Sequence, residues 1–115
     1  MTNETELRLQ QNCFVWFHNT YPQFRGLFFR IKNEGTNRIS GAIGKATGIV
    51  PGVSDSILLL PDGMGAQMIE FKTEKGTQSP HQKIWQETIT KNLYSYIIIR
   101  ELTEFQQICK RLLGS

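Results

Sequence analysis

The sequence contains few cysteines and no long apolar run. Its two cysteines, Cys13 and Cys109, lie too far apart for the C-x-x-C spacing of a zinc site. We therefore expect neither a zinc site nor a disulfide framework, and we expect buried, reduced thiols in a cytoplasmic protein. No apolar run approaches the roughly 20 residues that cross a bilayer, and the polar start of the chain is unlike a signal peptide. We expect no membrane partner.

Charge of one sign is only slightly in excess. The chain has 13 lysines and arginines against 10 acids, which gives a net charge of +3 and a pI near 9.0. This mild basicity is compatible with a polyanionic partner but does not identify one. Hydrophobic residues make up 39% and charged residues 20% of the sequence, which is ordinary for a globular domain. A chain of 115 residues can bury one core, so we expect a single domain over 1–115.

The stretch from residue 48 to residue 72 contains the most informative pattern. Residues 48–60 and 66–72 are largely apolar and are bounded by proline and glycine, which is typical of strands. The intervening P-D-G-M-G has the composition of a turn. A hairpin closed by this turn would pair Ala66 with Leu60.

Such a hairpin would gather acids and a base on one surface. Side chains alternate along a strand, so Glu70 and Lys72 share one side of it. The pairing also brings Asp55 close to opposite Glu70. Two carboxylates and one ammonium at a strand edge form a site for a hard divalent cation and a water. The alternative is a solvated strand surface, where an E-x-K pair makes only a weak ion pair.

Elements on either side of the hairpin complete a mixed sheet flanked by helices, in the order α-β-β-β-α-β-α. The apolar strand over 94–99 follows a helix, so it should lie parallel to the Glu70 strand. Thr103 is expected to cap the last helix, with Gln106 as its capping-box partner. The expected elements are a helix over 5–19, strands over 26–31 and within 48–72, a helix from residue 80, the strand over 94–99 and a helix over 104–113. Small residues over 39–48 also suit a short helix, which this order leaves out. The G-K-A-T run in the same segment lacks the spacing of a P-loop, so we expect no nucleotide cofactor.

These residues carry a resemblance to a known family. Asp55 followed by Glu70-Phe71-Lys72 resembles the PD-(D/E)XK nuclease pattern. The wider pattern resembles the VRR-NUC (virus-type replication-repair nuclease) branch, and it comprises Asn33-Glu34-Gly35, Arg38, Gly48 to Asp55 with its glycine spacing, Glu70-Phe71-Lys72, Ser79-Pro80 and Gln82. The resemblance spans roughly residues 6 to 113. Ser54 departs from it, because the family usually has proline there. The resemblance implies a restriction-endonuclease-like core.

The resemblance also implies an activity. Family members are endonucleases that use Mg²⁺ or Mn²⁺ to cut branched, flapped or four-way DNA in replication, repair or recombination. By analogy the metal ligands would be Asp55, Glu70, the carbonyl of Phe71 and Glu6. Lys72 would hold or help deprotonate the attacking water. A bacterial or phage-type intracellular protein and a homodimer with two sites fit this expectation.

Two assignments within this site have alternatives. Glu6 with Gln10 matches the E-x-x-x-Q pair on the family's first helix, whereas an acid in a first turn can also simply favour the helix dipole, and Glu4 competes for the role. Gln82 is counted in the catalytic set, but its spacing from Ser79 is also explained by a capping box.

Further basic and polar residues are candidates for nucleic-acid contact. The resemblance places the Asn-x-Gly loop and the basic residue after it beside the scissile strand. The candidates are Asn33, Arg38, Lys45 and Lys83, and each could equally be solvated surface. A second hypothesis is a catalytically silent nucleic-acid-binding or assembly module with the same fold; the loss of an acid or of the lysine would favour it, and none is lost. An RNA-binding domain is not indicated, because no aromatic R-G-F-type motif is present.

Overall fold

A four-stranded mixed sheet forms the centre of the molecule. The computed structural model describes residues 5–31 and 38–114, with the backbone alone for 38–41. The strand order is β1-β2-β3-β4, in which β1 and β3 pair with β2 antiparallel and β4 pairs with β3 parallel. The elements are α1 (Glu6–Thr20), the 3-10 turn η1 (Pro22–Phe24), β1 (Phe28–Arg30), α2 (Arg38–Ala46), β2 (Ser56–Leu59), the 3-10 turn η2 (Pro61–Gly63), β3 (Ala66–Phe71), α3 (Pro80–Lys91), β4 (Ser95–Ile99) and α4 (Leu102–Leu113).

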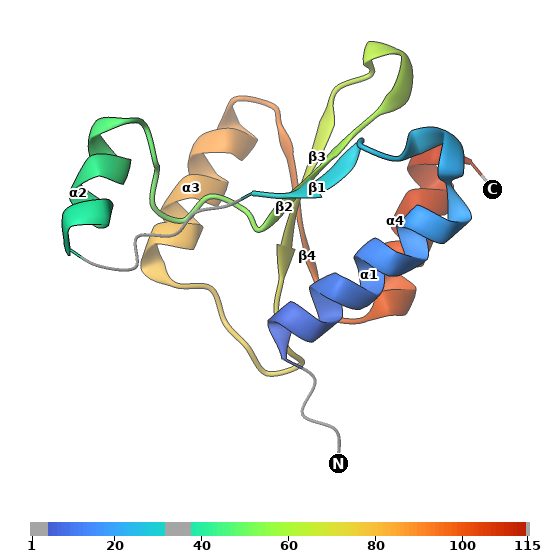
Figure 1. Cartoon of the computed structure of the whole chain (residues 1–115), viewed down its shortest axis with the longest axis horizontal. Coiled ribbons are helices and arrows are strands. Elements are labelled where there is room, and N and C mark those ends of the chain that lie inside the picture. Colours follow the sequence, from blue (N-terminus) through green and yellow to red (C-terminus); the bar gives the residue numbers. More distant parts are fainter. Residues whose placement is uncertain (1–4, 32–37, 115) are drawn as a thin grey trace.

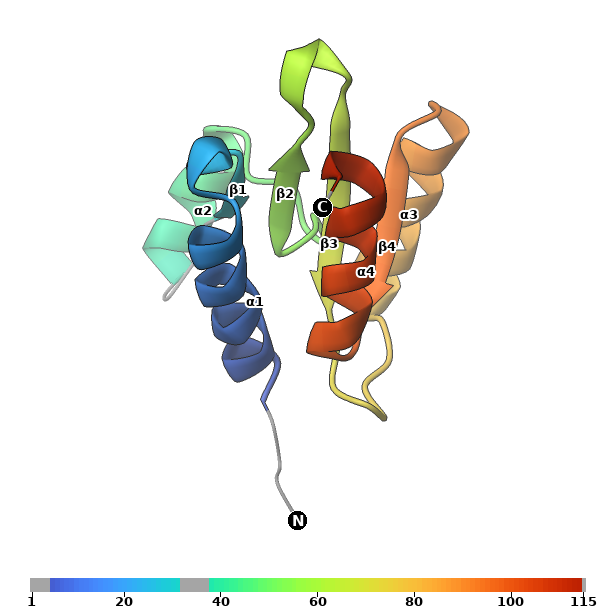
Figure 2. The ribbon, with the colours of Figure 1, turned by 90° about the vertical axis from the view of Figure 1, so that its right-hand side faces the viewer.

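The helices lie on both faces of the sheet. Figures 1 and 2 show α1 and α4 side by side on one face, with α3 on the opposite face. The predicted mixed sheet flanked by helices is confirmed. Helix α2, between β1 and β2, adds one element to the expected order and lies over the segment whose small residues suited a short helix.

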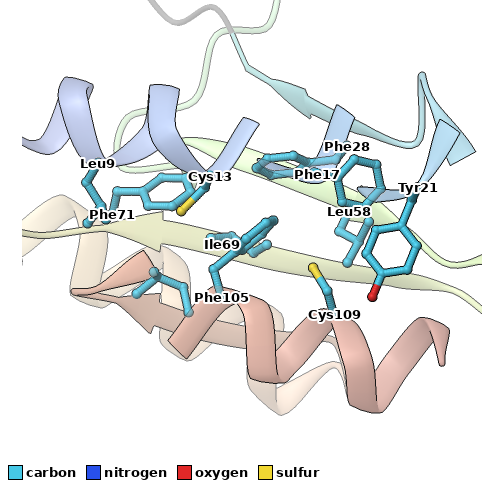
Figure 3. Packing of buried hydrophobic residues seen from close by; sticks show 11 residues of the cluster. Leu9, Cys13, Phe17, Tyr21, Phe28, Leu58, Ile69, Phe71, Phe105 and Cys109 are labelled. Carbon is cyan, nitrogen blue, oxygen red and sulfur yellow. The ribbon is translucent and has the colours of Figure 1, made fainter. Parts of the chain in front are cut away.

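The core lies between the sheet and the α1–α4 pair. It joins Phe17 of α1, Phe28 of β1 and Phe105 of α4, and the ring centroids of Phe28 and Phe105 are 4.8 Å apart. Figure 3 shows this packing together with Cys13 and Cys109. Both cysteines are buried and unpaired by disulfide, as the sequence predicted, and burial raises the pKa of the Cys109 thiol to about 12.

The predicted hairpin forms with a register that differs by one residue. Ala66 pairs with Leu59, not with Leu60. The amide of Leu60 instead donates to the carbonyl of Gly65, because Asp62 and the glycine after it take positive φ and tighten the turn. Continued toward the start of β2, the observed register places Asp55 opposite the β3 position of Glu70.

The start predicted for the last helix is also wrong. Helix α4 begins at Leu102, two residues before the predicted start, and Thr103 lies inside it. The carboxylate of Glu104 accepts hydrogen bonds from the backbone N–H groups of Arg100 and Glu101, which moves the capping box upstream of the predicted one. The predicted stop at Gly114 is confirmed, with φ of 86°.

Among the residues that the structure describes, no helix is long and apolar enough to cross a membrane.

Candidate active site

Asp55 lies at the junction of three strands. Its backbone carbonyl accepts a hydrogen bond from the Ile31 amide at the end of β1 (2.8 Å). Its carboxylate oxygen Oδ2 accepts one from the Phe71 amide of β3 (2.7 Å). Backbone and side chain are thus both tied to neighbouring strands, so this carboxylate is fixed at the end of β2 where it meets the last residues of β3.

Glycine is required in the loop that leads to Asp55. Gly52 has φ of +83°, and a Cβ at this position would collide with the His81 carbonyl oxygen in the first turn of α3. Gly48 also has a positive φ, +106°, but no atom lies close to its would-be Cβ. A backbone-on-backbone contact between this loop and α3 therefore requires glycine at position 52, whereas at position 48 only the backbone conformation favours it.

Glu70 is completely buried on the α3 side of β3, at 0% exposure. Its Oε2 accepts a hydrogen bond from the Gln82 side-chain amide at 2.9 Å. The same oxygen lies 4.0 Å from the Lys72 ammonium nitrogen, and Lys72 is itself buried. The other oxygen, Oε1, has no hydrogen-bond partner among the residues that the structure describes. A buried carboxylate with one oxygen unpaired is an expensive arrangement for a purely structural residue.

Burial and a second acid control the protonation of Glu70. Burial is the main cause that raises the pKa of Glu70 to about 9. The charge of Asp55 raises it further, Lys72 lowers it, and the charge of Glu6 adds a smaller increase. Without a cation, Glu70 therefore keeps its proton at neutral pH, because burial and the adjacent acid both disfavour its charged form.

Gln82 completes the predicted capping box and also contacts Glu70, while its role in catalysis stays a prediction. Its side-chain oxygen accepts a hydrogen bond from the Ser79 amide, while its own backbone amide donates to the Ser79 hydroxyl, which completes the capping box of α3. Its side-chain nitrogen donates to Glu70. The cap thus fixes which way the amide points and directs its N–H groups at the acid.

Tyr96 and Gln78 surround the same acid, and the sequence analysis missed both. Tyr96 pairs with Met68 across β3 and β4, so it lies on the face that carries Glu70. Burial raises the pKa of Tyr96 to about 12, and the charge of Glu70 contributes. Gln78 donates a hydrogen bond to the Tyr96 hydroxyl at 3.1 Å. If the alternation of side chains had been extended from β3 to its parallel neighbour β4, it would have placed Tyr96 on the same face as Glu70.

An open cleft of about 440 Å³ lies next to this group of residues, and the buried Glu70 and Lys72 are not among the residues that line it. Asp55 and Gln82 line it from the sheet and α3, while Glu6 and Gln10 line it from α1. The two members of the E-x-x-x-Q pair therefore face the same cleft as Asp55. Glu6 is half-buried in the first turn of α1, where Thr5 is the N-cap. Arg30, at the end of β1, also lines the cleft and brings a positive charge to it.

Of the residues predicted to contact nucleic acid, the two whose side chains the structure describes do not line this cleft. Lys45 is exposed in the last turn of α2, and Lys83 is exposed on α3. Arg38 is the first residue of α2, and its side chain lies outside the described part of the chain. Asn33 lies outside the described residues altogether. The role of each stays a prediction.

The loop between β3 and α3 is held by one arginine. Arg100, just after β4, donates hydrogen bonds from Nη1 to the backbone carbonyls of Thr73, Glu74 and Gly76, at 2.7, 3.3 and 2.8 Å. This loop joins Lys72 to the start of α3, so the guanidinium fixes the connection between the lysine and the helix that carries Gln82.

The donor set suits a hard divalent cation. Within residues 5–31 and 38–114, no three His, Cys, Asp or Glu side chains converge in a way that could hold a metal ion. The two carboxylates, Asp55 and Glu70, offer the oxygen ligands that Mg²⁺ and Mn²⁺ prefer. The unpaired Oε1 of Glu70 and the proton that Glu70 retains both indicate a place for positive charge. The residues present therefore fit such an ion.

Two solved structures share this architecture. One, described as a VRR_NUC domain protein, matches 98% of this chain and 91% of its own with a TM-score of 0.77 and 18% identity. Another, described as a VRR_NUC domain, matches 92% of this chain and 96% of its own with a TM-score of 0.61, also at 18% identity. No protein-family model matches the sequence, and no curated protein is significantly similar to it. The chain thus has the fold of VRR_NUC domain proteins, as the motif resemblance predicted.

Proposed function

We propose that this chain is a metal-dependent nuclease that hydrolyses phosphodiester bonds in DNA. The observation that carries the proposal is the buried carboxylate pair, Asp55 and Glu70, with the Lys72 nitrogen 4.0 Å from one of its oxygens. The fold of the nuclease-type neighbours supports it. A structural role alone leaves unexplained why a fully buried acid keeps one oxygen unpaired next to another acid.

Asp55 and Glu70 would hold Mg²⁺ or Mn²⁺, with Glu6 and the Phe71 carbonyl as further proposed ligands. A bound divalent ion activates water and stabilises charge on a phosphate. Lys72 would keep its ammonium beside Glu70, where it positions the attacking water and offsets negative charge that develops on the phosphate oxygens. Gln82 would hold the Glu70 carboxylate in one orientation, because its own amide is fixed by the helix cap.

Cleavage of labelled branched DNA with Mn²⁺ tests this proposal. Wild type should nick the DNA, and EDTA should abolish nicking. Lys72→Ala and Asp55→Asn should be slower by about 100-fold or more, the usual loss when one charge-stabilising or proton-transferring group is removed. Lys91→Ala, which removes an exposed lysine from the last turn of α3, is the matched control and should cut like wild type.

Equal cleavage by wild type and Lys72→Ala, or cleavage that survives EDTA, would contradict the proposal. Binding of branched DNA without cleavage by any variant would instead favour the silent nucleic-acid-binding module.

Calorimetry with Mn²⁺ tests the metal site independently of cleavage. Because Glu70 has a pKa of about 9, the ion should displace close to one proton at pH 7. The measured enthalpy should therefore vary with the ionisation enthalpy of the buffer. Asp55→Asn should weaken binding. Strong binding without proton release would show that the ion does not sit on the Glu70 carboxylate.

Gln82→Glu separates the two tasks of this residue. Glutamate is the usual capping-box partner, so α3 should keep its start. The donor to Glu70 is lost and a third acid is added, so cleavage should fall steeply. Ser79→Ala is the complementary variant: it should weaken the cap by about 0.5–2 kcal/mol and leave most of the cleavage rate. If Gln82→Glu cut DNA as fast as wild type, the contact between Gln82 and Glu70 would have no role in cleavage, and Gln82 would serve only as the helix cap.

We also propose that the substrate is branched DNA and that two copies of the chain act together. Two copies would present two sites to the two strands of a junction. Light scattering, alone and with a four-way junction, measures this: a dimer mass supports the proposal, and a monomer bound to one arm contradicts it.

A further inference from the structure

A second, apolar groove of about 390 Å³ lies beside the cleft. Leu7 and Phe14 of α1 form one wall, and Phe29 of the edge strand β1 contributes to the other. All three are substantially exposed, at 60%, 46% and 38%. Large aromatic side chains are normally buried, so a hollow with apolar walls at the surface indicates a binding site.

The groove and the cleft are continuous. Leu7, Gln10 and Arg30 line both of them. A ligand that enters the cleft therefore meets the groove as its next surface, with the Arg30 guanidinium at the junction. A cation between a site for phosphate chemistry and an apolar hollow matches the alternation of phosphate and base along a nucleic-acid strand.

A buried hydroxyl lies in the floor of the groove. Ser56, the first residue of β2, is 1% exposed and lines the groove. Its Oγ has no hydrogen-bond partner in the part of the chain that the structure describes. Leaving such a group unpaired costs roughly 1–3 kcal/mol. A ligand with its own donor or acceptor would satisfy this hydroxyl, whereas a purely apolar partner would not.

We propose that this groove takes the base of an unpaired nucleotide next to the scissile phosphate. The inference rests on the proposed nuclease function and names how the substrate is held. The base stacks on the exposed ring of Phe14, the phosphate beside it passes Arg30, and the Ser56 hydroxyl bonds the edge of the base. Branched and flapped DNA contain such unpaired nucleotides, and uninterrupted duplex must open a base to supply one.

An abasic scan of the substrate tests the groove. A branched DNA that wild type cuts is synthesised with one abasic nucleotide, moved stepwise away from the cut. Cleavage should slow about 5- to 150-fold at one position, the loss expected when base–aromatic stacking is removed. Phe14→Ala should cut the intact DNA with the same loss and show no further loss with the abasic DNA. Met64→Ala, which removes an exposed side chain at the hairpin tip, should behave like wild type.

Ser56→Ala tests the hydrogen bond to the base. Its readout is the dependence of the cleavage rate on the identity of the base, which a change in packing alone would not alter. Wild-type rates should differ among the four bases at the sensitive position, and in Ser56→Ala these rates should converge. The variant should be no less stable than wild type, because the hydroxyl lacks a partner in the free protein.

Three other results would each contradict the proposal that the groove binds a base. Cleavage that is insensitive to abasic sites at every position leaves the nuclease standing and removes the base pocket. A change of Phe14→Ala from dimer to monomer in light scattering assigns the groove to the contact between copies of the chain. Absence of any cleavage by wild type, with no binding of branched DNA, rejects the nuclease and the base pocket with it.

Discussion

The raised pKa of Glu70 makes a quantitative prediction for the stability of the metal-free protein. The unfolded chain releases this proton near pH 4.5, whereas the folded protein keeps it until about pH 9. Between these values unfolding releases a proton, so the free energy of unfolding must fall as pH rises. The stabilising contribution of the retained proton is complete below about pH 4.5 and is lost as pH approaches 9.

The size of the effect follows from the proton linkage. One pKa unit corresponds to about 1.4 kcal/mol, so two pH units, from pH 5 to pH 7, correspond to roughly 2.5 kcal/mol. A typical domain is stable by only about 5–15 kcal/mol, which makes this change easy to measure. Because Glu70 is fully buried, water does not screen the effect away.

Urea unfolding in EDTA, followed by tryptophan fluorescence at several pH values between 5 and 8, measures this slope. Glu70→Gln should remove it, and the difference between wild type and Glu70→Gln cancels titrations common to both proteins. Asp55→Asn should make the slope shallower, because it removes the neighbouring charge that raises the pKa of Glu70. A difference between wild type and Glu70→Gln that stays constant from pH 5 to pH 8 would refute the reasoning.

Three further predictions test the surroundings of the site. Gly52→Ala should destabilise the protein by clearly more than 1 kcal/mol in urea unfolding, whereas Gly48→Ala, with a positive φ but open space around it, should lose less; equal losses would show that the contact with α3 is unimportant. Arg100→Ala should speed hydrogen exchange in the loop between β3 and α3 and leave the exchange of β2 unchanged, because the loop loses its carbonyl hydrogen bonds. Cys109 should resist a thiol reagent in the native protein and react once urea unfolds it, because its thiol is buried and its pKa is about 12.

Local signals explain what the sequence could predict. The start of α3 is specified within four residues by Ser79, Pro80 and Gln82, and the structure shows that capping box. The parallel pairing of β4 with β3 follows from the helix between them. The convergence of Asp55 with Glu70 needed only strand alternation and a hairpin.

Features that depend on tertiary contacts could not be predicted in the same way. The turn at Asp62 takes a positive φ that its sequence did not require, and the hairpin register moved by one residue. Glu104 caps α4 by reaching back to backbone N–H groups upstream, a role that Thr103 fitted equally well on sequence alone. The position of Arg30 at the junction of cleft and groove depends on how α1 packs on the edge strand.

The N-terminus of α3 contacts both segments that carry the acids. Its backbone rests against Gly52, three residues before Asp55, and its Gln82 side chain holds Glu70. At Gly52 no side chain separates the helix backbone from the loop backbone, so no side chain can adjust its conformation when the helix moves. A shift or tilt of α3 by a fraction of an ångström would therefore alter the spacing of the two carboxyl groups directly. Whatever presses on the outer surface of this helix would change that spacing without touching either acid.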